Sequence, residues 1–148
     1  MAGNFQLTVV TPQRLMLQEE AERVAVRTSE GEIGILYDHS PLVTPLGVGL
    51  LRAKVGKEYR PVAISGGGFL EILPEKVTVL ADRAEYPEEI DVDRAQQAKE
   101  KAEKRLAGHR VADEEEINFT RARSSLMRAL TRLEAAKWVG ETSQYRRG

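Results

Sequence analysis

An acid and an arginine stand one turn apart where the character of the sequence changes. In the stretch EEIDVDRAQQ, residues 88–97, Asp91 and Arg94 fall in the first turn of a predicted helix. A carboxylate at that position can cap the helix by accepting from a free backbone N–H group. An arginine there can form a surface ion pair, which contributes about 1 kcal/mol or less. Any further role for the two residues needs other charges placed nearby by the fold.

Basic residues gather in the C-terminal part of the chain. Residues 1–89 carry 9 Lys+Arg against 13 Asp+Glu, a net charge of −4, whereas residues 90–148 carry 13 against 10, a net charge of +3. From Asn118 onward the cations are Arg121, Arg123, Arg128, Arg132, Lys137, Arg146 and Arg147. Such a face is commonly no more than solvated surface, but it would also suit an acidic protein surface or a phosphate ligand.

Residues for catalysis or for metal binding do not form a recognisable pattern. The stretch SGGGF, Ser65–Phe69, lacks the Lys-Ser/Thr of a phosphate-binding loop, and GVGLLR from Gly47 lacks the third glycine of a dinucleotide fingerprint. Both are interpreted as turns or bulges between strands. His39 and His109 are far apart, and the chain has no cysteine. The sequence therefore predicts neither a nucleophile nor a metal site, and few aromatics argue against nucleic-acid binding.

Composition indicates a globular chain with room for one domain or a small domain and an appendage. Of the 148 residues, 41% are hydrophobic and 30% charged. No apolar run approaches the ~18 residues that would suggest a transmembrane helix. The first ten residues lack the features of a signal peptide, and this, with the absence of cysteine, predicts a reducing compartment.

Residues 1–88 have the pattern of a β-sandwich. Stretches such as FQLTVVT and KVTVLAD alternate apolar and polar residues, and Gly and Pro separate further short apolar runs. Roughly seven to ten strands fit into about 85 residues, which is typical of an antiparallel sandwich or barrel.

Residues 89–148 have the pattern of a two-helix antiparallel hairpin, so the predicted fold class is α+β in two parts. The first helix is expected at about 91–107, with Asp91 as N-cap and Gly108 as the stop. The second is expected at about 114–139, opened by a D-x-x-E capping pattern at Asp113 and Glu116 and closed by Gly140. The first helix offers alanines rather than large side chains to its partner, so we expect the hairpin to be weakly held and able to open without unfolding the sandwich.

Four segments together resemble one family over nearly the whole chain, from Phe5 to about Lys137. They are VVTPQRLM, TSEGEIGILYDHSPLVTPLGVGLLR, ISGGGFLEILPEKVTVLADRAE and IDVDRAQQAKEKAEKRL. In this order they are similar to the epsilon subunit of bacterial F-type ATP synthase. Two segments depart from the family's pattern: the loop 108–119, within the stretch AGHRVADEEEINFT of residues 107–120, is longer and more acidic, and the tail GETSQYRRG extends further.

The resemblance implies a rotor part of the central stalk rather than an enzyme. It implies that the sandwich binds the gamma subunit and the ring of c subunits, with Glu32 and His39 as contact candidates. The sequence leaves open the alternative that Glu32 is only an acidic residue in a turn and that His39 is only a structural histidine in a loop. The resemblance also implies that the hairpin can extend along gamma to the alpha and beta subunits and inhibit ATP hydrolysis through Arg121, Arg123, Arg128 and Arg132. The protein would be peripheral, on the cytoplasmic face of the cell membrane or on the stromal side of a thylakoid.

The resemblance implies a role in ATP binding for Asp91 and Arg94, through a motif found in members of the family that bind ATP. The motif Ile/Leu-Asp-x-x-Arg-Ala opens their first helix, and two arginines four residues apart on the second helix complete the site. The matching residues here are Glu85, Ile90, Asp91, Arg94, Ala95, Arg128 and Arg132. Arginines at this spacing share a helical face and can converge on a triphosphate. ATP is thus expected as a regulatory ligand, with no cofactor required. The alternative is a free-standing ATP-sensing module of the same fold.

Overall fold

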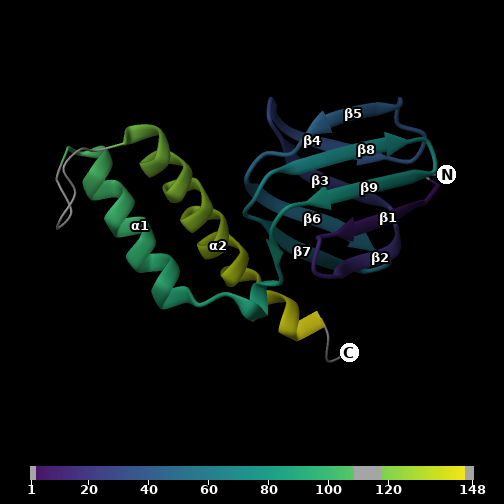
Figure 1. Ribbon diagram of the computed structural model, residues 1–148. Coiled ribbons are helices and arrows are strands. Elements are labelled where there is room, and N and C mark those ends of the chain that lie inside the picture. The colour runs from purple at the N-terminus through teal and green to yellow at the C-terminus, as the bar shows by residue number, and fades with distance from the viewer. Residues whose placement is uncertain (1–2, 109–117, 146–148) are drawn as a thin grey trace.

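The computed structural model describes residues 3–108 and 118–145, which form a β-sandwich followed by a two-helix hairpin (Figure 1). The strands of the sandwich are β1 (Phe5–Val10), β2 (Leu15–Ala21), β3 (Arg23–Thr28), β4 (Gly31–Leu36), β5 (Leu42–Pro45), β6 (Gly49–Val55), β7 (Glu58–Ile64), β8 (Gly68–Leu73), β9 (Lys76–Ala81) and β10 (Ala84–Glu85). A 3-10 turn, η1 (Pro87–Glu89), leads to the helices α1 (Val92–Leu106) and α2 (Phe119–Tyr145).

The strands form two five-stranded sheets packed face to face. One sheet has the order β2-β1-β9-β8-β5 and the other the order β10-β7-β6-β3-β4. The predicted sandwich is confirmed, but one pair departs from the antiparallel pattern, because β1 runs parallel to β9. These two strands are far apart in the chain, and their relative direction depends on the path through both sheets, which local patterns do not reveal.

Alternating residues of the strands fill the space between the sheets. In β1, Phe5, Leu7 and Val9 are buried, and in the neighbouring β9 so are Val77 and Val79. Because successive side chains of a strand point to opposite faces, the period-two pattern of the sequence places all of them on the inner face. Large aliphatic and aromatic side chains thus make up a continuous core.

The predicted boundaries of the first helix agree closely with α1. The Asp91 side chain caps the helix: its Oδ1 accepts from the Arg94 backbone N–H at 3.1 Å. Past the other end, Gly108 has φ +86°, a left-handed conformation that favours glycine, and its N–H donates to the Arg105 carbonyl at 3.0 Å.

The second helix begins later than predicted. Asn118 caps α2, since its Oδ1 accepts from the Arg121 backbone N–H at 3.0 Å. The helix therefore starts at Phe119 and not near residue 114. The pattern at Asp113 and Glu116, with most of the long acidic loop, lies outside the described residues.

The second helix also ends later than predicted. It runs through Gly140 to Tyr145, beyond the expected end at about 139. A glycine inside a helix costs about 1 kcal/mol relative to alanine, but it does not by itself end the helix. Gly140 was therefore too weak a stop signal.

Small side chains lie between the two helices. Ala95 and Ala102 are the buried residues of α1, and Ala122 and Ala129 of α2 are also fully buried. We call these four residues the alanine seam. The seam confirms the expectation that α1 presents alanines to its partner.

The hairpin also packs on the sandwich through the second half of α2, an interface that the sequence pattern did not indicate. Leu50 of β6 and Ala63 of β7 form one apolar cluster with Ile90 and Ala135. Beside this cluster the ring centroid of Trp138 lies 6.0 Å from that of Tyr59. We call this second interface the docking cluster. The hairpin is thus held by two interfaces, of which only the alanine seam lies within it.

Candidate functional site

The segment between the sandwich and α1 positions the first of the predicted site residues. Glu85 belongs to the short edge strand β10, where it pairs with Ala63 of β7. Its carboxylate accepts from the Arg132 Nε atom of α2 at 2.7 Å, and both side chains are about 30% exposed. This ion pair joins the edge of the sandwich to the hairpin.

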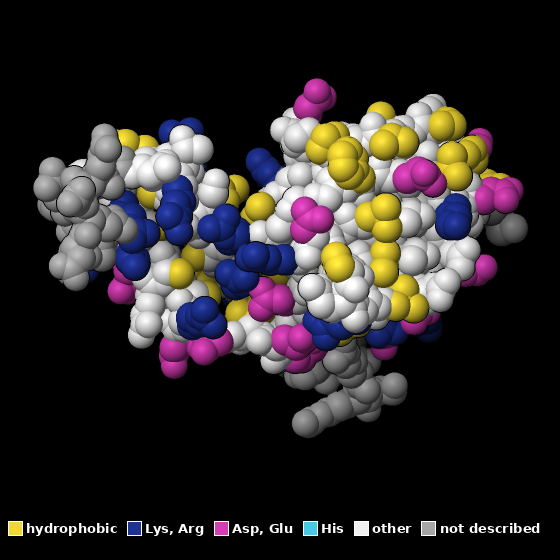
Figure 2. All heavy atoms as spheres, in the orientation of Figure 1, with side chains coloured by type: hydrophobic (Ala, Val, Ile, Leu, Met, Phe, Trp, Pro, Cys, Tyr) yellow, Lys and Arg dark blue, Asp and Glu magenta, His cyan; other side chains and the backbone are white. Residues whose placement is uncertain are grey.

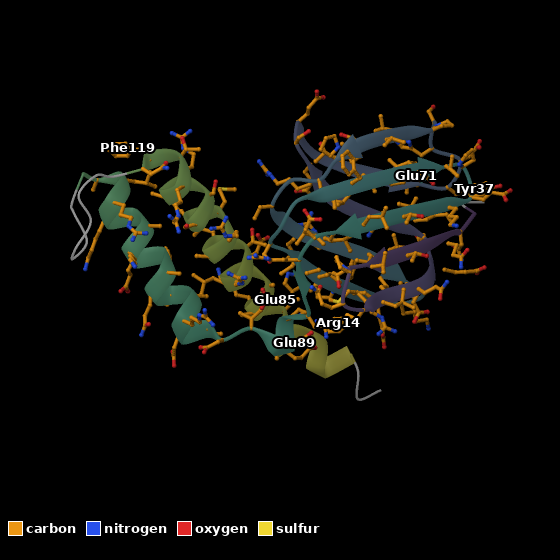
Figure 3. All side chains as sticks on the ribbon, viewed as in Figure 1. Arg14, Tyr37, Glu71, Glu85, Glu89 and Phe119 are labelled. Atoms are coloured by element: carbon orange, nitrogen blue, oxygen red, sulfur yellow. The ribbon has the colours of Figure 1, made fainter. Side chains whose placement is uncertain are left out.

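Just after Glu85 the chain is fixed by a second ion pair. The Arg14 guanidinium donates to both carboxylate oxygens of Glu89, at 2.6 and 2.8 Å, and lies 4.9 Å from the centroid of the Tyr86 ring. The hydrogen bond from Arg14 lowers the pKa of Glu89 below its ordinary value, and the Tyr86 backbone N–H lowers it further. Figure 3 shows Arg14 and Glu89 together at the point where the hairpin leaves the sandwich.

The start of α1 holds four of the predicted site residues in two environments. Ile90 and Ala95 are buried, Ile90 in the docking cluster and Ala95 in the alanine seam. Asp91 and Arg94 are exposed, and the Asp91 carboxylate already accepts the capping hydrogen bond. A carboxylate has two oxygens with several acceptor positions, so the cap leaves part of Asp91 free for a ligand.

The two arginines predicted on the second helix lie one turn apart on α2. Arg132 is paired with Glu85, whereas the Arg128 guanidinium donates to the Ser125 hydroxyl at 3.1 Å. Among the residues of 3–108 and 118–139, neither Arg94 nor Arg128 has a carboxylate partner. Two of the site's arginines therefore have charge available for an anion.

Two contacts show how the start of α1 lies relative to α2. Ile90 lies in the same cluster as Ala135, and Glu85 contacts Arg132, so the start of α1 lies beside the second half of α2. Of the predicted site residues, Glu85 and Arg132 are therefore the two that the structure shows in direct contact.

Arg121 and Arg123 lie near the opposite end of α2. Both side chains are exposed, in the first turns after Phe119. Phe119 is labelled at that end in Figure 3. In Figure 2 the Lys and Arg side chains gather over the hairpin and in the hollow between the hairpin and the sandwich. The basic residues thus form a surface along α2 rather than a single cluster.

Glu32 and His39 are not brought together. Glu32 lies near the start of β4 and pairs with Arg52, whose guanidinium also approaches Glu134 of α2 at 4.0 Å. His39 lies beyond the other end of β4, where its Nδ1 contacts the Ser40 carbonyl at 2.7 Å. At about 3.3 Å per residue the strand separates them by roughly 20 Å.

Sequence reasoning missed the residues that hold the hairpin against the sandwich. Trp138 and Tyr59 meet across the interface, and Arg14 fixes the connecting segment. A single aromatic residue near the end of a basic helix was the available signal for Trp138, because tryptophan is often an anchor in an interface. Arg14 and Glu89 are 75 residues apart, and nothing local marks them as partners.

The described residues contain neither a membrane-spanning helix nor a grouped set of metal ligands. No helix there is long and apolar enough to cross a membrane. In the same residues, no three His, Asp or Glu side chains are grouped so that they could hold a metal ion.

Comparison with known proteins places both parts of the chain. The family model described as "ATP synthase, Delta/Epsilon chain, beta-sandwich domain" matches residues 4–87. The model described as "ATP synthase, Delta/Epsilon chain, long alpha-helix domain" matches residues 88–137.

Relatives and solved structures match over most of their length. The ATP synthase epsilon chain of Halalkalibacterium halodurans is 50% identical over 132 residues, which cover 89% of this chain and 96% of that protein. That of Desulfitobacterium hafniense strain Y51 is 47% identical over 137 residues, covering 93% and 99%. A chain in the Euglena gracilis mitochondrial ATP synthase structure, OSCP/F1/c-ring in rotational state 1, superposes with a TM-score of 0.73 at 27% identity, covering 90% of this chain and 81% of that one. A chain of the Tetrahymena thermophila central stalk/c-ring has a TM-score of 0.58 at 13% identity, covering 91% and 98%, and shares the fold.

Proposed function

The chain belongs to the ATP synthase delta/epsilon family, and we propose that it serves as a central-stalk rotor subunit that also regulates ATP hydrolysis. It is an epsilon-type subunit of the F-type synthase rather than an enzyme in its own right. The observation that carries the regulatory part is the contrast between a large-residue core in the sandwich and an alanine seam in the hairpin. Next to the seam in the sequence, Arg94 and Arg128 have no carboxylate partner among the described residues.

The sandwich is the part that couples proton translocation to ATP synthesis, through contacts with the gamma subunit. The outer face of the sheet that contains β5, β8 and β9 carries exposed apolar side chains, among them Val43, Phe69 and Leu80, which are 66, 56 and 50% exposed. Phe69 is paired with Leu80 across the sheet. Figure 2 shows hydrophobic side chains gathered over this face. Apolar patches of this kind mark protein interfaces, and gamma is the partner that the family membership supplies.

The ring of c subunits is the second proposed partner of the sandwich. His39 and Tyr37 lie at the end remote from the hairpin, where Tyr37 is labelled in Figure 3. Glu32 lies at the other end, beside Arg52 and α2. Of the two expected contact residues, His39 is therefore the one that lies away from the docked hairpin and stays accessible to the c ring. Cross-linking of single-cysteine variants at these positions to the c ring would test each contact separately.

The hairpin is the part that inhibits ATP hydrolysis. In the extended state α2 would carry Arg121, Arg123, Arg128 and Arg132 to acidic loops of the beta subunits, beside alpha. Opposite charges interact more strongly in such a partly desolvated interface than on a wet surface. Replacing the four arginines with alanine should relieve inhibition of the assembled enzyme. Undiminished inhibition would show that insertion of the helix blocks the enzyme without help from its charge.

ATP would act as a regulator that favours the docked hairpin. A ligand shifts an equilibrium only by its differential affinity for the two states. An ATP molecule held by Arg94 of α1 and by Arg128 and Arg132 of α2 binds fully only when the helices lie together. At a concentration ~100 times its dissociation constant the ligand stabilises the bound state by ~2.7 kcal/mol, and falling ATP would release the hairpin.

Calorimetric titration of the isolated chain with ATP tests the nucleotide site. Arg94→Ala and Arg128→Ala should each bind ATP about tenfold more weakly, the loss expected for one charge-assisted hydrogen bond. Asp91→Asn keeps a capping side chain but loses the charge, so it separates a role in the cap from a role toward ATP. Lys104→Ala removes an exposed cation elsewhere on α1 and should bind as the wild type does. Unchanged binding in all the variants would leave Asp91 as a cap and the arginines as surface residues.

The alternative, a free-standing ATP-sensing module, is distinguished by copurification. The rotor proposal expects the tagged chain to come from its host with alpha, beta and gamma subunits, as a peripheral complex on the cytoplasmic face of the cell membrane or the stromal side of a thylakoid. Recovery of the chain alone under conditions that keep the synthase intact would favour the sensing module.

A further inference from the structure

We propose that the cleft between α2 and the sandwich binds a phosphate group through Arg27, Arg123 and Ser65. The cleft has a volume of about 560 Å³. Its walls are the turn between β3 and β4, the segment before β6, the turn between β7 and β8, and the first half of α2. None of these three residues belongs to the proposed nucleotide site, but Arg128, which that site uses, also lines the cleft.

The charge of the cleft favours an anion. Arg27, Arg123 and Arg128 line it, and Glu30 is the one acid among the lining residues that the structure describes. The net charge of the lining is therefore positive. The hollow between hairpin and sandwich in Figure 2 has several Lys and Arg side chains at its edge. Guanidinium groups are suited to phosphate because their N–H groups can donate two parallel hydrogen bonds.

A buried hydroxyl in the cleft wall lacks a partner. Ser65 is 2% exposed, and its Oγ atom has no hydrogen-bond partner among the described residues. A buried polar group without a partner carries a free-energy cost, so such groups usually have one. A phosphate oxygen in the cleft would accept from this hydroxyl and remove the cost.

A glycine leaves room for the side chain of one of the cleft's cations. Gly66 and Gly67 follow Ser65 in the wall, and a Cβ atom at these positions would lie 3.0 Å from the Arg83 backbone nitrogen and 3.4 Å from the Asp82 carboxylate, neither of which lines the cleft. At Gly49 a Cβ atom would lie 2.9 Å from the Arg27 Cβ atom, too close for the two to coexist. The SGGG and GVG stretches, which lack the complete motifs of nucleotide-binding loops, thus serve a cleft whose other cations come from α2.

The proposed site exists only while the hairpin is docked. Arg123 and Arg128 belong to α2, whereas Arg27 and Ser65 belong to the sandwich. Phosphate bound between them would favour the docked state for the same reason as ATP. The phosphate could be free orthophosphate or a phosphate of a bound nucleotide, and these two sources share the chemistry described here.

Amide NMR of the full chain, titrated with orthophosphate against chloride at matched ionic strength, tests the site. We expect saturable shifts of the Gly66 and Gly67 amides, with about tenfold weaker binding in Arg123→Ala. Arg121→Ala is the matched control, because it removes the same charge from an exposed position outside the cleft and should bind as the wild type does. Ser65→Ala should weaken binding while leaving the melting temperature without phosphate unchanged or slightly higher, since it removes an unpaired hydroxyl.

A parallel titration with ATP distinguishes free orthophosphate from a phosphate of a bound nucleotide. Shifts with orthophosphate support a free phosphate, and shifts with ATP alone assign the cleft to a phosphate of the nucleotide. In either case Arg123→Ala must reduce them and Arg121→Ala must not. The absence of saturable shifts with both ligands would overturn the proposal. Equal losses in the two arginine variants would also overturn it, because they would indicate general charge attraction.

Discussion

The sandwich and the hairpin of this chain are held together by different sizes of side chain. In the sandwich the fully buried residues include Phe5, Ile35, Leu70 and other large apolar side chains, whereas between the helices they are alanines. The free energy gained by burial grows with apolar area, so the sandwich is the more stable part. A protein that must keep one part fixed while another part opens can achieve this through core composition alone.

The largest expected effect on the free energy of unfolding comes from a Leu→Ala substitution, made once in the sandwich and once in the hairpin. Leu70→Ala in the sandwich removes a fully buried side chain and should lower the free energy of unfolding by about 2–5 kcal/mol. Leu126→Ala in α2 removes a half-buried side chain and should cost clearly less. Chemical denaturation followed by circular dichroism measures both. Equal losses would mean that the two parts unfold as a single unit of uniform stability.

The next effect comes from filling the alanine seam. Ala129 is 1% exposed, so Ala129→Leu should force the helices apart at a cost of about 1–3 kcal/mol. We expect faster hydrogen exchange in α1 and unchanged exchange in the sandwich. The control Gln97→Leu adds an apolar side chain at an exposed position of α1 and should leave exchange unchanged. Loss of protection in the sandwich as well would contradict independent opening.

A smaller effect is expected at the ion pair between the two parts. Glu85 and Arg132 are both partly exposed, so their coupling should be about 1 kcal/mol or less. A double-mutant cycle with Glu85→Gln and Arg132→Gln, measured on hairpin opening by hydrogen exchange, gives this energy. The pair Lys99–Glu103, which lies within α1, is the control and should not affect docking of the hairpin on the sandwich. A coupling near zero would leave the docking cluster and the longer Arg52–Glu134 ion pair to hold the hairpin on the sandwich.

The smallest effect should appear as a pH dependence at the connecting segment. Arg14 lowers the pKa of Glu89 below the ordinary value of 4.5. A depressed pKa stabilises the fold above the ordinary pKa, and this stabilisation is lost as the pH falls through the folded-state value. The difference in melting temperature between the wild type and Arg14→Gln should therefore shrink from about pH 6 to about pH 3. Lys57→Gln removes a similar charge and should show no such trend, and a constant difference for Arg14→Gln would mean that Glu89 does not titrate with the pair.

Local patterns predicted most of the fold because most of it is locally encoded. Alternation along the strands gave the sandwich, and Asp91 and Gly108 gave the limits of α1. The start of α2 was placed too early because Asp113 and Asn118 are both plausible caps, and only the structure shows that Asn118 is used. The parallel pairing of β1 with β9 depends on the whole chain path and could not be predicted locally.

The resemblance proposes residues for the site but does not indicate how the hairpin is attached to the sandwich. Sequence resemblance named Glu85 and Arg132, and the structure shows that they touch. It did not indicate that Trp138 reaches Tyr59 or that Ile90 packs with Leu50, because contacts between parts distant in sequence leave no periodic pattern. The docking cluster raises the stability of the docked hairpin above what the alanine seam alone would provide.

Hydrogen exchange of the isolated chain with and without ATP, followed by mass spectrometry, tests the central claim most directly. The account predicts that without ATP the amides of α1 and of the first half of α2 exchange faster than those of β1 and β9. Addition of ATP should slow exchange in the helices and leave the strands unchanged, and Arg94→Ala should abolish the response. Uniform exchange across both parts, or helices that do not respond to ATP, would contradict a hairpin that opens on a fixed sandwich and is closed by the nucleotide.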